Sequence, residues 1–278
     1  MKIGVSLPFD YLAGGHNPIW SAEMGSVSQC LKTLKDYGVD SVELRAINGN
    51  TDISLLLTAL DTVFTNGMEA TIHGTLPPFS EDIIIDSPYA TACKKLKEYG
   101  QDAIITVHGY RSDELANETL AERTALATDA LLTMAEQEDL PLKLALELNR
   151  EKHGNDPGRN WHGLLDLHAL TKRKELGFCW DFGHSISNIL RGYMNHSPPA
   201  AFLERVIHTH IHGTNQEGQT HWPIRHDCDS TRRWMEMLAE VNYTGILNLE
   251  LEPERFIKYV RLREGLTESL GYLKDCRF

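Results

Sequence analysis

Six short apolar runs of this chain each end in a residue whose side chain can bind a metal ion. The terminal residues are His73, His108, Glu147, Asp181, His210 and Glu250. They follow one another at intervals of 35, 39, 34, 29 and 40 residues, about the length of one strand plus a crossover helix. Eight such units would fill about 280 positions, and the chain has 278. The spacing therefore predicts an α/β fold, a closed parallel (β/α)8 TIM barrel in a single domain over residues 1–278.

The segments between the apolar runs fit the helices of such a barrel. Residues 116–138 form the longest candidate, with Leu120 and Leu131 on one apolar side. Gly38 and Gly100 each stand between a predicted helix and the next strand, where glycine supplies the left-handed C-cap. No linker or low-complexity segment divides the chain, which favours one domain.

A closed parallel barrel brings the C-terminal ends of its strands to one face, where the active sites of such enzymes lie. The three histidines and three carboxylates are therefore expected to converge. Buried carboxylates are costly unless they are paired or bound to a cation. Arg45 of the second strand is available to one of them, and the alternative is that the acids are solvated or paired with loop arginines. Mixed carboxylate and imidazole donors suit a divalent metal ion such as Mn, Zn or Co.

The segment His208-Thr209-His210-Ile211-His212 alternates histidine with other residues. A strand has a side-chain period of two, so all three imidazoles are expected on the same side. The run is too long for all three to bind one ion. We expect His210 to be the ligand, with His208 deeper in the barrel and His212 in the following loop.

The composition bears on partners and location. The chain carries 27 basic against 39 acidic residues, a net charge of -12, whereas nucleic-acid binding depends on neutralising phosphates. No apolar stretch approaches the ~18 residues of a membrane span. The five cysteines form no CxxC pair, and the first residues lack a signal-peptide pattern. We expect a cytoplasmic protein with a small-molecule substrate and no nucleic-acid or membrane partner; the sequence leaves open whether it forms a homo-oligomer.

The ordered set of strand-end motifs resembles the xylose-isomerase-like barrel superfamily. This group includes ketose 3-epimerases, inosose isomerases and dehydratases, and apurinic nucleases of the endonuclease IV type. The motifs that carry the resemblance are Val42-Glu43-Leu44, Ile72-His73, Val107-His108-Gly109, Leu146-Glu147, Asp181-Phe182-Gly183-His184, His210-Ile211-His212 and Leu249-Glu250.

The resemblance implies a role for each strand-end residue. It implies that the four-ligand metal site of the isomerases and epimerases is formed here by Glu147, Asp181, His210 and Glu250. Further residues match the additional ligands of the three-zinc nucleases, namely His73, His108, His184 and His221. One departure concerns the Asp-x-His pair of the nucleases, which reads Gln219-Thr220-His221 here.

These residues predict a divalent-metal-dependent isomerase or epimerase of a sugar, keto sugar or cyclitol. Glu147 and Glu250 are the expected catalytic residues, which remove and return the proton next to a carbonyl through an enediolate. The alternatives are a lyase or dehydratase acting on a keto sugar or cyclitol, and a zinc phosphodiester hydrolase similar to endonuclease IV. Four loop aromatics are expected to form apolar walls for a sugar ring, namely Trp20, Phe79, Trp161 and Trp222.

Overall fold

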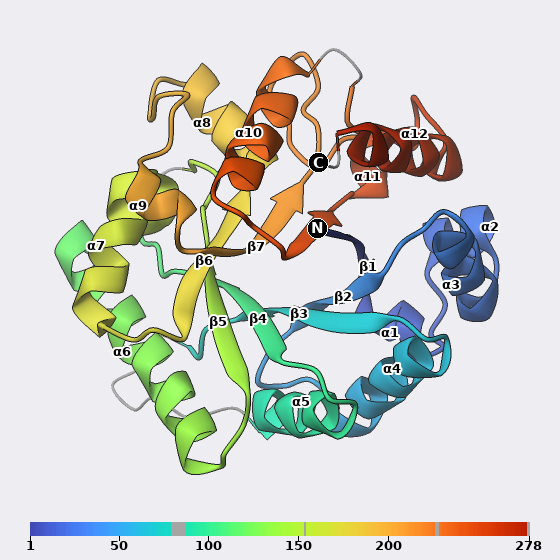
Figure 1. Cartoon of the computed structure of the whole chain (residues 1–278), viewed down its shortest axis with the longest axis horizontal. Helices are drawn as coiled ribbons and strands as arrows, with labels where there is room; N and C mark the ends of the chain where they lie inside the picture. The colour runs from blue at the N-terminus through green and yellow to red at the C-terminus, as the bar shows by residue number, and fades with distance from the viewer. Residues whose placement is uncertain (79–86, 153, 226–227, 277–278) are drawn as a thin grey trace.

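Eight parallel strands form the centre of the molecule. The computed structural model describes residues 1–78, 87–152, 154–225 and 228–276. Each strand pairs with the next one in the sequence, and β8 pairs with β1, so the sheet closes into a barrel (Figure 1). The strands are β1 (Lys2–Pro8), β2 (Ser41–Ile47), β3 (Glu69–Thr75), β4 (Ala103–His108), β5 (Leu142–Glu147), β6 (Leu176–Asp181), β7 (Val206–Ile211) and β8 (Ile246–Leu249). The predicted (β/α)8 barrel is confirmed.

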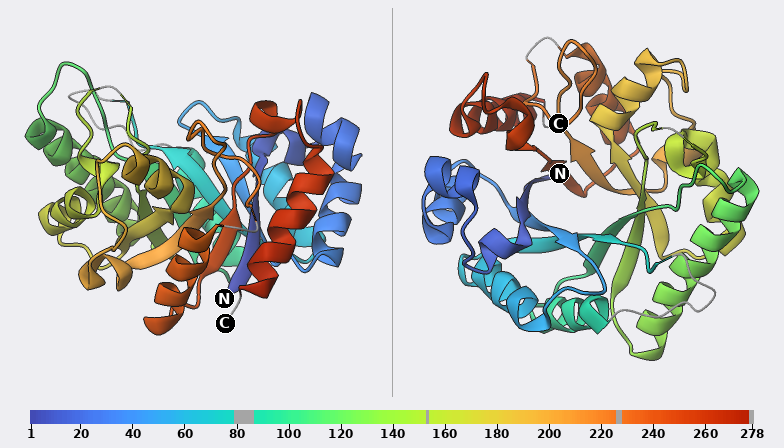
Figure 2. Two further views of the ribbon diagram at one scale, coloured as in Figure 1. Left: turned by 90° about the horizontal axis from the view of Figure 1, so that it is seen from above. Right: turned by 180° about the vertical axis from the view of Figure 1, so that it is seen from behind.

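The helices surround the strands, as the two views of Figure 2 show. They are α1 (Phe9–Leu12), α2 (Pro18–Met24), α3 (Val27–Asp36), α4 (Ile53–Thr65), α5 (Ser87–Glu98), α6 (Asn117–Gln137), the 3-10 turn η1 (Pro157–Arg159), α7 (Trp161–Thr171), α8 (Phe182–Leu190), α9 (Ala200–Leu203), α10 (Asp229–Glu240), α11 (Pro253–Phe256) and α12 (Leu262–Asp275). Within the described residues, no helix combines the length and apolar composition needed to cross a membrane.

Local sequence signals fix several of these boundaries. α6 covers the helix predicted over residues 116–138 to within one residue at each end. Gly38 and Gly100 have φ angles of 73° and 69° after α3 and α5, as predicted from their positions. α3 begins at a capping box, in which Ser26 and Gln29 satisfy each other's backbone N–H groups.

A cluster of aromatic side chains fills the space between β6 and the helices outside it. Trp161 of α7 packs edge-on against Trp180 of β6, and both contact Phe202 of α9. Trp161 is 2% exposed and Trp20, in α2, is completely buried. The expectation that these two tryptophans wall a sugar site is therefore wrong. Large aromatic rings contribute most to stability when buried, and here they join helices to the barrel.

Candidate metal centre

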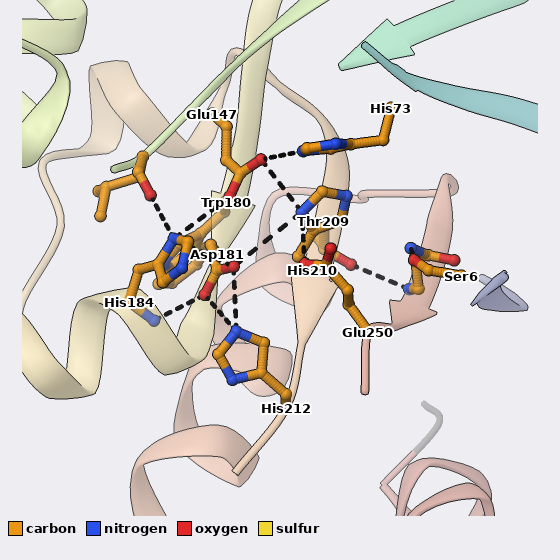
Figure 3. Close-up of polar contacts among 12 residues, drawn as sticks. Ser6, His73, Glu147, Trp180, Asp181, His184, Thr209, His210, His212 and Glu250 are labelled. Atoms are coloured by element: carbon orange, nitrogen blue, oxygen red, sulfur yellow. Dashed lines mark hydrogen bonds and ion pairs between the residues drawn. The ribbon is translucent and has the colours of Figure 1, made fainter. Parts of the chain in front are cut away.

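Four side chains from consecutive strands meet at the C-terminal end of the barrel (Figure 3). Glu147 and Asp181 are the last residues of β5 and β6, His210 is the last but one of β7, and Glu250 directly follows β8. All four are buried. Nδ1 of His210 lies 3.3 Å from Glu147, 3.2 Å from Glu250 and 4.0 Å from Asp181. The barrel therefore brings together the four residues that the sequence analysis groups as one metal site.

Glu43 of β2 holds the ring of His210 in place. The Glu43 carboxylate contacts Nε2 of His210 at 3.0 Å and Nε2 of His208 at 2.9 Å. It also accepts hydrogen bonds from Ser6 and Asn248. A carboxylate bound to one ring nitrogen of a histidine fixes the orientation of the other nitrogen, as is usual behind a metal-binding histidine. Nδ1 of His210 therefore faces the three acids.

Three further histidines surround Glu147. Nε2 of His73 lies 2.8 Å and Nε2 of His108 lies 3.5 Å from its Oε2 atom. His184 places Nδ1 at 3.2 Å from both Glu147 Oε1 and Asp181 Oδ2. The side chain of Asp181 also accepts the backbone N–H of His184 at 2.6 Å and so caps α8. One carboxylate thus contacts imidazoles from four different elements.

His212 and His221 complete the group on the side of Asp181 and Glu250. His212 follows the last residue of β7, as predicted, but it is fully buried and its Nε2 lies 3.1 Å from Asp181. The backbone N–H of His221 donates to Nδ1 of His212 at 2.9 Å. His221 has a φ angle of 65°, a conformation that costs free energy for a residue other than glycine and that recurs at functional sites.

The charges of this cluster depend on one another. Burial raises the pKa of the Glu147 carboxyl, but the imidazoles of His108 and His210 outweigh it and hold that pKa well below its usual range. Burial lowers the pKa of His184, but Asp181 and Glu147 outweigh it and raise that pKa to about 8. Arg45 lies 3.7 Å from Glu250 and so pairs with one of the acids, a possibility raised by its position on the second strand. The acids remain ionised and attract positive charge.

These residues fit a divalent cation. Nδ1 of His210 is buried and has no hydrogen-bond partner within the part of the chain that the structure describes, although it lies beside two carboxylates. Leaving a buried ring nitrogen without a hydrogen-bond partner costs free energy unless that nitrogen binds another group, such as a cation. The combination of imidazole and carboxylate donors suits Zn, Mn or Co. The sets His73–His108–Glu147 and Asp181–His184–His212–His221 also place potential ligand atoms within 4.8 Å of one another.

A cavity of about 450 Å³ opens onto this cluster, a volume within the usual range for small-molecule sites. Its floor contains Glu147, Glu250 and four of the histidines. The other lining residues are Thr75, Leu76, Gly109, Tyr110, Arg111, Asn149, Arg150, Lys152, Glu252 and Arg255.

Among the described residues, Trp222 does not line this cavity, contrary to the expectation from the sequence. Trp222 is half-buried and packs against Phe256 and Tyr259, in a separate hollow. Phe79 lies outside the described residues. Leu76 and Tyr110 provide the apolar wall instead.

Comparison with known proteins agrees with this architecture. The sequence profile of the xylose isomerase-like TIM barrel family matches residues 31–276. The chain belongs to this family. A comparison with functionally curated proteins gives no match.

Several solved structures share the fold over almost the whole chain. A D-tagatose 3-epimerase-like protein is 20% identical, with a TM-score of 0.65 over 99% of this chain and 97% of the other. The 3-keto-D-glucoside 4-epimerase of E. coli is 14% identical, with a TM-score of 0.66 over 99% and 98%. The IOLI protein, solved with a bound zinc atom, is 14% identical, with a TM-score of 0.64 over 99% and 98%. At these identities the likeness establishes the fold.

Two groups of residues at the site were not predicted from the sequence. Glu43 belongs to one of the strand motifs without an expected role, although a carboxylate inside an apolar strand run is a signal that a buried partner exists. The basic residues of the cavity form the second group, of which Arg150 and Arg255 follow β5 and β8 by three and six residues. Their position in the loops that form the active-site face is the signal that was available.

Proposed function

We propose that this protein is a divalent-metal-dependent isomerase or epimerase of a sugar, keto sugar or cyclitol. The observation that carries the proposal is the placement of Nδ1 of His210 within 3.3 Å of both Glu147 and Glu250, two carboxylates that line a cavity of sugar size. Membership of the xylose isomerase-like family supports it, as do structural neighbours whose names identify them as sugar epimerases.

Glu147, Asp181, His210 and Glu250 would hold the metal ion. When bound there, a divalent cation supplies Lewis acidity, which lowers the free energy of an enediolate. Glu147 and Glu250 come from β5 and from the end of β8, so they approach a substrate from different sides of the cavity. One glutamate, as the carboxylate, removes the proton from the carbon next to the carbonyl, and the other, after taking up a proton from water, donates that proton to the opposite face. The first glutamate then releases its proton to water, so that both carboxyl groups return to their starting states.

Proton abstraction gives a direct test. We expect the metal-loaded protein, incubated in D2O with ketoses, their phosphates and keto sugar acids, to place deuterium on the carbon next to the carbonyl of at least one compound. Proton NMR measures this exchange and identifies the product. A product that has lost water would favour the lyase or dehydratase alternative, because that reaction begins with the same step. No exchange with any compound would contradict the proposed function.

A second candidate function is a zinc phosphodiester hydrolase similar to endonuclease IV. The contacts of His73 and His108 with Glu147 Oε2 favour it, because they offer ligands for a further metal ion. Gln219 opposes it: the side chain is exposed and its amide oxygen accepts a hydrogen bond from Asn215. The test is cleavage of duplex DNA at an abasic site, which should be strongly inhibited by salt.

Replacing Glu43 by Gln is expected to weaken metal binding by about 10- to 100-fold, the usual cost of losing a carboxylate behind a metal-binding histidine. The amide keeps the shape of the side chain but loses the negative charge that faces His210 and His208. Competition with a chromophoric chelator measures the affinity. Glu236→Gln, at an exposed position of α10, is the control. An unchanged affinity in Glu43→Gln would show that Glu43 does not orient the ligand.

A further inference from the structure

Four basic residues surround the opening of the cavity, namely Arg111, Arg150, Lys152 and Arg255; we call them the mouth cations. Arg111 and Lys152 are exposed, Arg150 and Arg255 are half-buried, and the carboxylates of the metal centre lie beneath them. The whole chain has a net charge of -12. The opening of this cavity is therefore rich in positive charge, although the chain as a whole is strongly negative.

Two of the mouth cations converge on a single hydroxyl group. Arg150 donates to Oγ1 of the buried Thr220 at 3.2 Å, and Arg255 donates to the same atom at 3.4 Å. Arg255 also forms an ion pair with Glu252. Two guanidinium groups that share one acceptor lie close enough to repel each other, so this arrangement has an electrostatic cost.

Apart from Arg255, no mouth cation forms an ion pair with a carboxylate within the described residues. Glu252 offsets part of the repulsion at Arg150 and Lys152, but its effect is smaller than that of the neighbouring arginines. Burial lowers the pKa of Arg150, and the positive charge of Arg255 lowers it further. Burial and the nearby Arg111 likewise lower the pKa of Lys152. A bound anion would relieve this repulsion.

We propose that the mouth cations bind an anionic group of the substrate, so that the substrate is a polyhydroxy carbonyl compound carrying a phosphate or a carboxylate. This inference rests on the proposed function for the reacting end of the substrate. Guanidinium groups match the oxygens of both anions in paired hydrogen bonds. The mouth cations line the same cavity of about 450 Å³ as Glu147 and Glu250 of the metal centre, so one small molecule reaches both.

Binding measurements on the metal-loaded protein test the proposal without requiring turnover. The probes are D-fructose, D-fructose 6-phosphate and D-gluconate, each titrated by calorimetry. We expect at least one anionic probe to bind at least tenfold more tightly than D-fructose, and the two anionic probes distinguish phosphate from carboxylate. In Arg150→Gln this advantage should fall at least tenfold, whereas Arg150→Lys should retain part of it.

Two controls make the result specific. Arg233→Gln, at an exposed position on α10 outside the cavity, should keep the full preference for the anion. Lys152→Gln, which changes an exposed side chain, provides a second test if Arg150→Gln does not fold. Equal affinities for neutral and anionic probes would overturn the proposal. A preference that survives in both Arg150→Gln and Lys152→Gln would also overturn it, because the metal centre itself would then bind the anion.

The outcomes separate this proposal from the proposed function. Deuterium exchange confined to neutral ketoses, with no preference for anions, would support the isomerase or epimerase and refute the anion site. Tight binding of anionic probes that depends on Arg150, without exchange in any compound, would support the site and refute the proposed reaction. Tight binding of duplex DNA instead of the small anionic probes would overturn the inference and favour the hydrolase.

Discussion

Replacing Glu147 by Gln is expected to reduce turnover by about 10³-fold, near the middle of the usual range for loss of a general base. Glu147 is 1% exposed and contacts His73, His184 and His210, so the substitution removes both a proton acceptor and a negative charge that attracts the cation. The rate of deuterium exchange, measured with the compound that exchanges fastest, gives the loss of turnover. Glu236→Gln on the exposed side of α10 should leave the rate unchanged.

Metal content distinguishes the two roles of Glu147. We expect both Glu147→Gln and Asp181→Asn to contain less metal after purification and dialysis than the unmodified protein, as measured by elemental analysis. Asp181 is fully buried, and it lies beside His210 and His184. Full metal occupancy in both variants would refute the joint site, even if activity were lost.

Removing the metal ion is expected to lower the melting temperature by about 5–10 °C. A cation that binds only the native state, at one hundred times its Kd, contributes about 2.7 kcal/mol to the free energy of unfolding, and each kcal/mol shifts the melting temperature by about 2–4 °C in a chain of this size. The acids at the floor of the cavity lose their counter-charge when the ion leaves, which acts in the same direction. Calorimetry with and without a chelator measures the shift.

Adding Mn or Zn back should restore the original melting temperature. Asp181→Asn, whose affinity for the ion is expected to be reduced, should respond less to the chelator. An unchanged melting curve in the unmodified protein would contradict a tight metal site at Glu147 and Glu250. It would leave the assignment of the barrel unaffected, because that assignment rests on the pairing of the strands.

Part of the site follows from local sequence patterns. The spacing from His73 to Glu250 reflects the repeating strand and helix unit, and parallel strands have their C-terminal ends on one face. This is why the six strand-end residues could be expected to converge before the fold was known, whereas the narrower set of Glu147, Asp181, His210 and Glu250 was what the family resemblance implied. The alternation in residues 208–212 likewise predicted that its imidazoles share one side, because a strand has a side-chain period of two.

Local patterns do not identify contacts between distant loops. The sequence predicts Trp20 and Trp161 in loops that follow strands, yet both lie in helices and are buried, because packing against neighbouring elements decides whether such an aromatic faces the cavity. In the same way, the three-dimensional arrangement alone brings Arg150 and Arg255 to Thr220, over separations of 70 and 35 residues.

The barrel, and the strand ends that carry ligand-type residues, could be predicted from the amino-acid sequence, because the spacing of the apolar runs and the side-chain periodicity are properties of residues close together in the chain. The contacts of Glu43 with both His208 and His210, and the gathering of the mouth cations around the cavity that the acids line, become visible only in the folded chain. These contacts depend on how the strands are staggered around the barrel and on how each loop packs against the next. Neither the stagger of the strands nor the packing of the loops can be predicted from a periodic pattern in the sequence.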